Sequence, residues 1–147
     1  MWKIYKEESS DLGFAIGCLF LQAINWNEFR QWVEVCINDL NQEEIPLYMF
    51  DLMDFEDSLA KIHLVIGFVP STGLSKTEKI ALEGISYLRG VDIFDPISTR
   101  EKSIECLKKN PHISEKFKRF LYESNKVSYW LTLKSLILFN GYNPLKK

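Results

Sequence analysis

Residues 75–90 read SKTEKIALEGISYLRG, and this stretch carries the clearest secondary-structure signal in the chain. Ser75 followed three residues later by Glu78 is the pattern of a capping box, in which each side chain accepts a hydrogen bond from the other residue's backbone N–H. Apolar residues then recur at helical spacing, and Gly90 provides the left-handed residue that commonly ends a helix. The stretch therefore predicts one helix with two recognisable ends.

The same signals, taken outward from this helix, predict an all-α protein. Asn25–Glu28 and Ser98–Glu101 also have the spacing of capping boxes, and they predict helices that reach Leu40 and Asn110. Further helices are predicted at 12–24, 47–53, 56–66, 114–123 and 127–139. No stretch alternates with the period of two that a strand requires. We expect a single domain over residues 1–147, with about seven to eight helices packed as antiparallel pairs because the connectors are short.

The predicted helix at 12–24 is apolar on nearly every face, which places it in the centre of the core. Gly13 and Gly17 lie one turn apart on it. We expect this pair to allow the close approach of another helix.

Charge is distributed unevenly along the 147 residues. Residues 1–60 contain three Lys and Arg against twelve Asp and Glu, a formal charge of −9, whereas residues 61–147 contain fifteen against eight, a charge of +7. Such an asymmetry bears on association rather than on the fold. The negative charge is concentrated between Asp39 and Asp57. The candidate partner-binding residues are therefore Asp39, Glu43, Glu44, Asp51, Asp54, Glu56 and Asp57.

Three aromatic residues, Tyr48, Phe50 and Phe55, are interleaved with these carboxylates. Carboxylates accelerate encounter with a basic partner, and exposed aromatic side chains provide buried contact area once the complex forms. We expect at least two of the three to pack in the core instead. The pattern favours a protein-binding module over an enzyme.

The cysteines and apolar runs indicate a soluble cytoplasmic protein. Cys18, Cys36 and Cys106 are widely spaced among apolar neighbours, without a CxxC pair, which is typical of buried free thiols in a reducing compartment. The apolar runs at 12–24 and 129–139 are too short to span a bilayer. We expect no membrane segment and no cofactor.

Two other function classes stay open. A metal-dependent hydrolase would use the carboxylates of Asp51, Asp54 and Asp57, with His63 as a further ligand, but no established metal-binding motif is present. A thiolate pair of Cys36 with His63 would require the fold to bring them together. No Walker loop, GxGxxG or GxSxG is present. We therefore expect no catalytic residues and no resident metal.

The second alternative is a helical nucleic-acid-binding module. Basic residues gather in the C-terminal third near Phe117, Phe120 and Tyr122, and a basic helix with aromatic residues can follow a phosphate backbone. These aromatic residues also fit the buried face of the helix at 114–123. The basic residues are Lys108, Lys109, Lys116, Lys118, Arg119 and Lys126.

Several short motifs resemble those of a family of small bacterial proteins of unassigned function. Members of this family lie beside polymorphic or contact-dependent inhibition toxins, as candidate immunity proteins. The likeness covers residues 26–119. It rests on the segments IPLYMFDLMDFED at 45–57, IGFVP at 66–70, ISYLRG at 85–90 and NPHI at 110–113.

The resemblance implies a cytoplasmic protein that binds one cognate toxin domain and blocks its active site or substrate path. Such toxin domains are commonly nucleases, and nucleases tend to be basic because they hold phosphate backbones. The carboxylates between Asp39 and Asp57 are then the expected contact surface.

Overall fold

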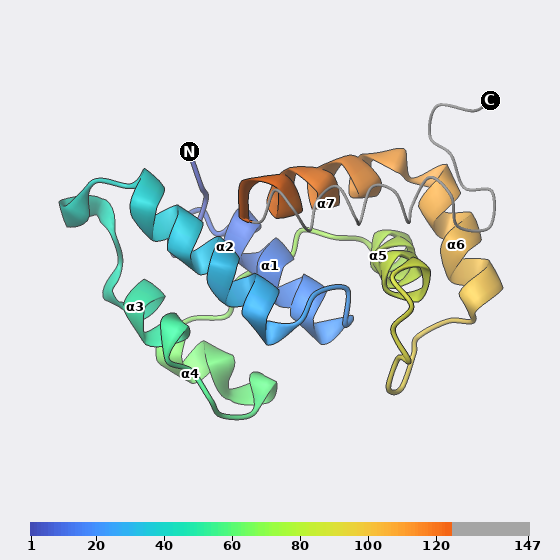
Figure 1. Ribbon diagram of the computed structural model, residues 1–147, viewed down its shortest axis with the longest axis horizontal. Coiled ribbons are helices and arrows are strands. Elements are labelled where there is room, and N and C mark those ends of the chain that lie inside the picture. The colour runs from blue at the N-terminus through green and yellow to red at the C-terminus, as the bar shows by residue number, and fades with distance from the viewer. Residues whose placement is uncertain (125–147) are drawn as a thin grey trace.

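The computed structural model describes residues 1–124, and this part of the chain is all-α, as predicted (Figure 1). It contains α1 (Ser10–Phe20), α2 (Trp26–Asp39), η1 (Gln42–Glu44), α3 (Leu47–Met53), η2 (Leu59–Lys61), α4 (Ile62–Ile66), α5 (Lys76–Leu88), α6 (Arg100–Lys109) and α7 (Pro111–Ser124), where η marks a 3₁₀ turn. The described residues form no strand, and their one β-type pairing is an isolated bridge between Tyr5 and Glu8. The predicted helix at 127–139 lies outside the described residues.

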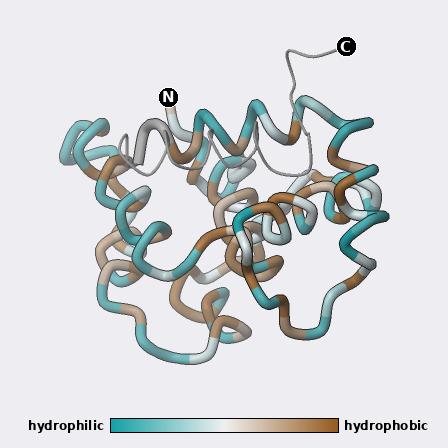
Figure 2. Tube along the Cα trace, turned by 45° about the vertical axis from the view of Figure 1, so that its right-hand side comes forward, coloured by the Kyte–Doolittle hydropathy of each residue, from teal (hydrophilic) through white to brown (hydrophobic). Residues whose placement is uncertain are grey.

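A single hydrophobic core extends from Trp2 to Leu121, and α1 runs antiparallel beside α2 within it (Figure 1). Trp32 of α2 is fully buried, with its ring edge-on to Trp2 at 5.6 Å and stacked near Phe120 of α7 at 5.3 Å. The N-terminal segment, α2 and α7 therefore meet at one aromatic cluster. Figure 2 shows hydrophobic residues gathered between the helices and hydrophilic residues on the outer turns.

Helix α1 is buried along almost its whole length, as predicted, but it ends at Phe20 and not at residue 24. The N–H of Ala23 donates to the carbonyl of Cys18 at 2.8 Å, and Gln22 adopts a left-handed conformation with φ of 64°. This is the hydrogen bond of a Schellman ending, with glutamine in the place that glycine usually takes. The Gln22 amide bonds both the N–H and the carbonyl of Phe94 at 2.9 Å, so a distant loop stabilises this turn.

Two of the predicted capping boxes form. Asn25 Oδ1 accepts from the Glu28 N–H at 2.8 Å, and Glu28 Oε1 accepts in return from the Asn25 N–H at 3.1 Å. Ser75 and Glu78 exchange the same pair of bonds at 3.1 and 3.0 Å. Local spacing alone therefore located the starts of α2 and α5.

Three other predicted helix starts are wrong by a few residues. The cap of α6 is Thr99, which accepts from the Lys102 N–H, so the predicted box between Ser98 and Glu101 does not form. Helix α7 begins at Pro111 rather than 114, because proline suits the first turn of a helix. The helix predicted at 56–66 is confined to η2 and α4.

Gly13 and Gly17 permit a close approach, but the partner is not the helix that we expected. A Cβ on Gly13 would lie 1.9 Å from the carbonyl oxygen of Ser71, and one on Gly17 would lie 3.2 Å from the Thr72 methyl group. Ser71 and Thr72 belong to the connection between α4 and α5, which crosses α1 at this point. Two helices do meet closely at Gly84, where a Cβ would lie 2.6 Å from the Ser103 carbonyl of α6.

Buried charges fix the remaining connections. Arg89 at the end of α5 pairs with Glu28 of α2 at 2.6 Å and also donates to the carbonyl of Ala23. Glu83 is 1% exposed, and its two carboxylate oxygens accept from the N–H groups of Ile97 and Ser98 at 3.0 Å each. Because every buried carboxylate named here has a donor, each one holds two segments of the chain together.

Glu78 also joins α5 to α7, and this contact predicts a pH-dependent contribution to stability. The Ser75 N–H and the His112 side chain, 2.6 Å away, lower the pKa of Glu78 below its ordinary value of 4.5. A carboxyl group with a lowered folded-state pKa stabilises the protein above its unfolded-state pKa and loses this contribution as the pH falls. We expect Glu78→Gln to lower the midpoint of thermal unfolding at pH 7 and to have little effect at pH 3. Calorimetry at pH 3, 5 and 7 measures this difference; an equal loss at all three values would contradict the assignment.

Candidate functional site

The seven candidate carboxylates lie on consecutive elements at one end of the molecule, and we call this set the acidic edge. Asp39 is the last residue of α2, Glu43 and Glu44 lie in η1, and Asp51 lies in α3. Asp54 caps the C-terminus of α3, and Glu56 and Asp57 follow in the connection to η2. In Figure 1 these elements occupy the left end of the molecule, whereas α5 and α6 occupy the right end.

Most of the acidic edge is unneutralised. Glu44 is partly buried and the other six residues are exposed. An ion pair forms at Asp57, whose carboxylate lies 3.6 Å from Lys61, while Asp39 accepts from Trp2 Nε1 at 3.0 Å and Glu44 from the Asn41 amide at 2.9 Å. Within the part of the chain that the structure describes, four side chains form neither an ion pair nor a hydrogen bond: Glu43, Asp51, Asp54 and Glu56.

Three other N-terminal carboxylates are neutralised within the molecule. Glu8 pairs with Lys3 at 3.0 Å, and Asp11 lies 3.8 Å from Arg119. Arg89 likewise pairs with Glu28, so both arginines named here reach buried carboxylates and not those of the acidic edge. Residues 39–57 therefore hold the densest group of exposed carboxylates, and this stretch includes no Lys or Arg.

The positions of these carboxylates do not favour the helices that carry them. Asp39 and Asp51 lie in the last turns of α2 and α3, and Asp54 caps the C-terminus of α3. A helix C-terminus carries a partial negative charge, so an anion there costs about 0.3–1 kcal/mol at an exposed site. Helix stability therefore does not account for the acidic edge.

Helix α3 also presents apolar side chains on the acidic edge. Leu47 is 82% exposed and Phe50 is 46% exposed. With Asp51 and Asp54 they occupy positions i, i+3, i+4 and i+7, which share one face of a helix. This face combines two apolar side chains with two carboxylates.

The two other aromatic residues of this stretch pack inward, as predicted. Phe55 is 7% exposed and lies 5.5 Å from the ring of Trp26. Tyr48 donates to the carbonyl of Ile4, and burial raises the pKa of its hydroxyl to about 12. Leu47 was not among the candidate residues predicted from the sequence. The spacing of Leu47 from Phe50 and Asp51 on one helix face was the signal that could have identified it.

The geometry offers little to the hydrolase alternative. Within the described residues, no group of three or more His, Cys, Asp and Glu side chains is placed to hold a metal ion. Cys36 is fully buried, whereas His63 is exposed, so they do not form a thiolate pair. Burial raises the pKa of both the Cys36 and Cys18 thiols, which keeps them protonated and unreactive.

The basic residues of α7 that lie in the described part of the chain each contact another side chain and do not form a free stripe. The Lys116 amine lies over the ring of Phe14 at 4.6 Å, and the Arg119 guanidinium lies over Trp2 at 4.7 Å. The side chain of Lys118 is 11% exposed and pairs with Glu115 at 3.3 Å. Phe117 and Phe120 are buried, as predicted, and are not available for base stacking. Lys126 lies outside the described residues.

Comparison of the chain with protein-family models, curated proteins and solved structures finds no match in any of the three. The resemblance to immunity proteins therefore stays a prediction. Among the described helices, none has the length and apolar character needed to cross a membrane.

Proposed function

We propose that this protein is a cytoplasmic immunity-type inhibitor that binds a basic toxin domain through the acidic edge. The observation that supports the proposal is the clustering of seven carboxylates at one end of the molecule, where Lys61 is the single cation paired with them among the described residues. Unpaired carboxylates of one sign raise the rate of encounter with a partner of opposite charge. The same end carries Leu47 and Phe50, which can form the apolar centre of an interface.

Inhibition follows from the kind of surface that a nuclease presents. A nuclease domain holds its substrate with Lys and Arg side chains that contact phosphates. Carboxylates fixed on α3 and its flanking turns compete for the same cations and cover the path of the nucleic acid. The chain itself performs no chemistry in this function.

The direct test uses the polypeptide encoded immediately upstream of this protein. We expect its C-terminal domain to bind the purified chain in a complex of defined stoichiometry and to lose toxic activity in that complex. We also expect the association rate to fall steeply with added salt, because the encounter is electrostatic. If the two purified proteins fail to bind at micromolar concentrations, or if the bound toxin keeps its activity, the proposal is wrong.

Phe50 provides a second and smaller test of the same surface. We expect Phe50→Ala to accelerate dissociation of the complex about fivefold, because truncation of an aromatic contact at the centre of an interface costs at least about 1 kcal/mol. The association rate should stay unchanged, since no charge is altered. Phe94→Ala is the matched control, because Phe94 is 83% exposed and lies on the loop before α6, away from the acidic edge. An equal effect of both substitutions would remove Phe50 from the interface.

A further inference from the structure

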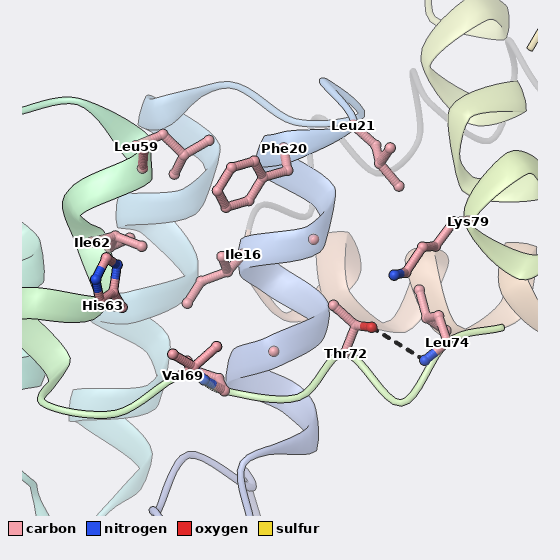
Figure 3. A pocket seen from close by; sticks show the side chains of 14 residues that line it. Ile16, Phe20, Leu21, Leu59, Ile62, His63, Val69, Thr72, Leu74 and Lys79 are labelled. Carbon is pink, nitrogen blue, oxygen red and sulfur yellow. Dashed lines mark hydrogen bonds between the residues drawn. The ribbon is translucent and has the colours of Figure 1, made fainter. Parts of the chain in front are cut away.

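A second candidate site lies where α1 meets η2, α4 and the connection between α4 and α5 (Figure 3). It is an apolar cavity of about 380 Å³. Its volume falls at the lower end of the range of about 300–1,000 Å³ that is typical of small-molecule sites.

One side of the cavity is formed by the segment that packs against Gly13 of α1. Ser71 sits against the bare backbone of Gly13, and this brings the 69–74 segment across α1. Ile16 and Phe20 of α1 then form one wall, and Leu59 and Ile62 form the opposite wall. Phe20 is 52% exposed, so the cavity opens to solvent with apolar surface uncovered.

Cationic and neutral groups line this cavity, and no carboxylate does. Lys79 of α5 extends its amine toward α1, and His63 of α4 lies on the opposite side of α1 (Figure 3). Lys79 forms no ion pair with any residue that the structure describes. The hydroxyl of Thr72 already accepts from the Leu74 N–H at 3.2 Å. Lys79 is therefore a cation in the lining that no carboxylate of the described residues neutralises.

The positive charge of Lys79 is opposite to that of the acidic edge. The cavity therefore suits an anionic ligand and not the basic toxin domain proposed for the acidic edge. We propose that the cavity binds a small amphipathic carboxylate, whose acyl chain starts between Ile16 and Ile62 and crosses the face of α1 at Gly17, and whose anionic head lies on Lys79. Burial of the acyl chain against the apolar walls favours binding, and the Lys79 amine gains a charged hydrogen-bond partner. The lining of the cavity shares no residue with the acidic edge.

Octanoate is a suitable probe, with 1-octanol as the neutral molecule of the same chain length. We expect calorimetric titration of the full chain to give one octanoate per molecule. We expect Lys79→Met to weaken octanoate binding at least fivefold, because the charge-assisted hydrogen bond to the carboxylate is lost. Binding of 1-octanol should be the same in wild type and Lys79→Met. Lys76→Met is the matched control, since Lys76 is exposed one turn earlier on α5 and does not line the cavity; it should bind octanoate as the wild type does.

A second variant tests the place of the acyl chain. Ala60 is exposed and lines the cavity, so Ala60→Trp fills the opening without entering the core, and it should weaken both ligands more than tenfold. Circular dichroism establishes that each variant is folded. The proposal is overturned if octanoate does not bind, if Lys76→Met weakens it as much as Lys79→Met, or if Ala60→Trp binds it with wild-type affinity.

Discussion

Replacing Asp51, Asp54 and Asp57 by lysine should slow association with a basic toxin domain more than tenfold and abolish most of the salt dependence of the association rate. These carboxylates are exposed, and Asp57 alone among them has an ion-pair partner in the described residues. Their field acts before contact, so reversal of charge removes steering and introduces repulsion. Stopped-flow association measured at several salt concentrations gives both quantities.

The control must change the net charge by the same amount elsewhere. The triple substitution takes the formal net charge from −2 to +4, because each of three carboxylates becomes a cation. Replacing Asp92, Glu101 and Glu105 by lysine makes the same change, and all three are exposed on the loop before α6 or on α6 itself. We expect this control to retain an association rate within about threefold of wild type, since exposed charges beyond a Debye length of about 8 Å are largely screened in physiological salt. Equal slowing in both variants would mean that overall charge, and not the acidic edge, governs encounter.

The charge reversal and the Phe50 substitution separate two physical roles of one surface. Long-range electrostatics alters the rate of encounter, whereas short-range apolar contact alters the lifetime of the complex. A surface that acted by charge alone would show no change in dissociation for Phe50→Ala. Measurement of both rates for both variants therefore identifies which part of α3 touches the partner.

The parts of the fold that sequence could predict are those governed by local hydrogen bonds. The capping boxes at Asn25 and Ser75 need only a residue and its neighbour three positions on, and both form. The box predicted at Ser98 fails for an equally physical reason. The N–H of Ser98 is already used by the buried carboxylate of Glu83, so the N-cap lies one residue later, at Thr99, and the helix begins at Arg100.

What sequence could not predict depends on contacts between distant residues. Helix α1 ends at Phe20 because Gln22 turns the chain, and that turn is held by the backbone of Phe94, which lies 72 positions away. No local pattern indicates such a partner, since glutamine rarely takes a left-handed conformation. The cavity beside Gly17 could not be predicted from the sequence either, because its lining comes from four separate segments.

In the candidate site, too, local features could be predicted from the sequence and contacts between distant residues could not. The clustering of the carboxylates was predictable because the stretch from Asp39 to Asp57 is short. Their exposure was predictable because burying an unpaired carboxylate is costly. The roles of the aromatic residues required the structure: Tyr48 bonds to the carbonyl of Ile4, while Phe50 faces solvent. Helical spacing identified which side chains share a face, but only packing determined which face is outside.

Gly13→Ala should destabilise the protein by about 2–3 kcal/mol, the upper part of the range for overpacking a tight site. The added Cβ would meet the carbonyl oxygen of Ser71 at 1.9 Å, a distance that cannot be accommodated without a shift of the backbone. Ser71 belongs to the segment that walls the cavity, so relief of the clash must move that wall or α1. Alanine favours a helix by about 1 kcal/mol over glycine. The energy of the clash must therefore exceed this gain in helix propensity for the free energy of unfolding to fall.

Gly17→Ala is the internal control, because it makes the same chemical change one turn later in α1. Its Cβ would lie 3.2 Å from the methyl group of Thr72, a side chain that can yield by a few tenths of an ångström. We expect the gain in helix propensity to offset this strain, leaving the free energy of unfolding within about 1 kcal/mol of wild type. Chemical denaturation of both variants compares them directly. If Gly13→Ala were no less stable than Gly17→Ala, the chain at Ser71 would not lie against α1, and the cavity that depends on this packing would lose its wall.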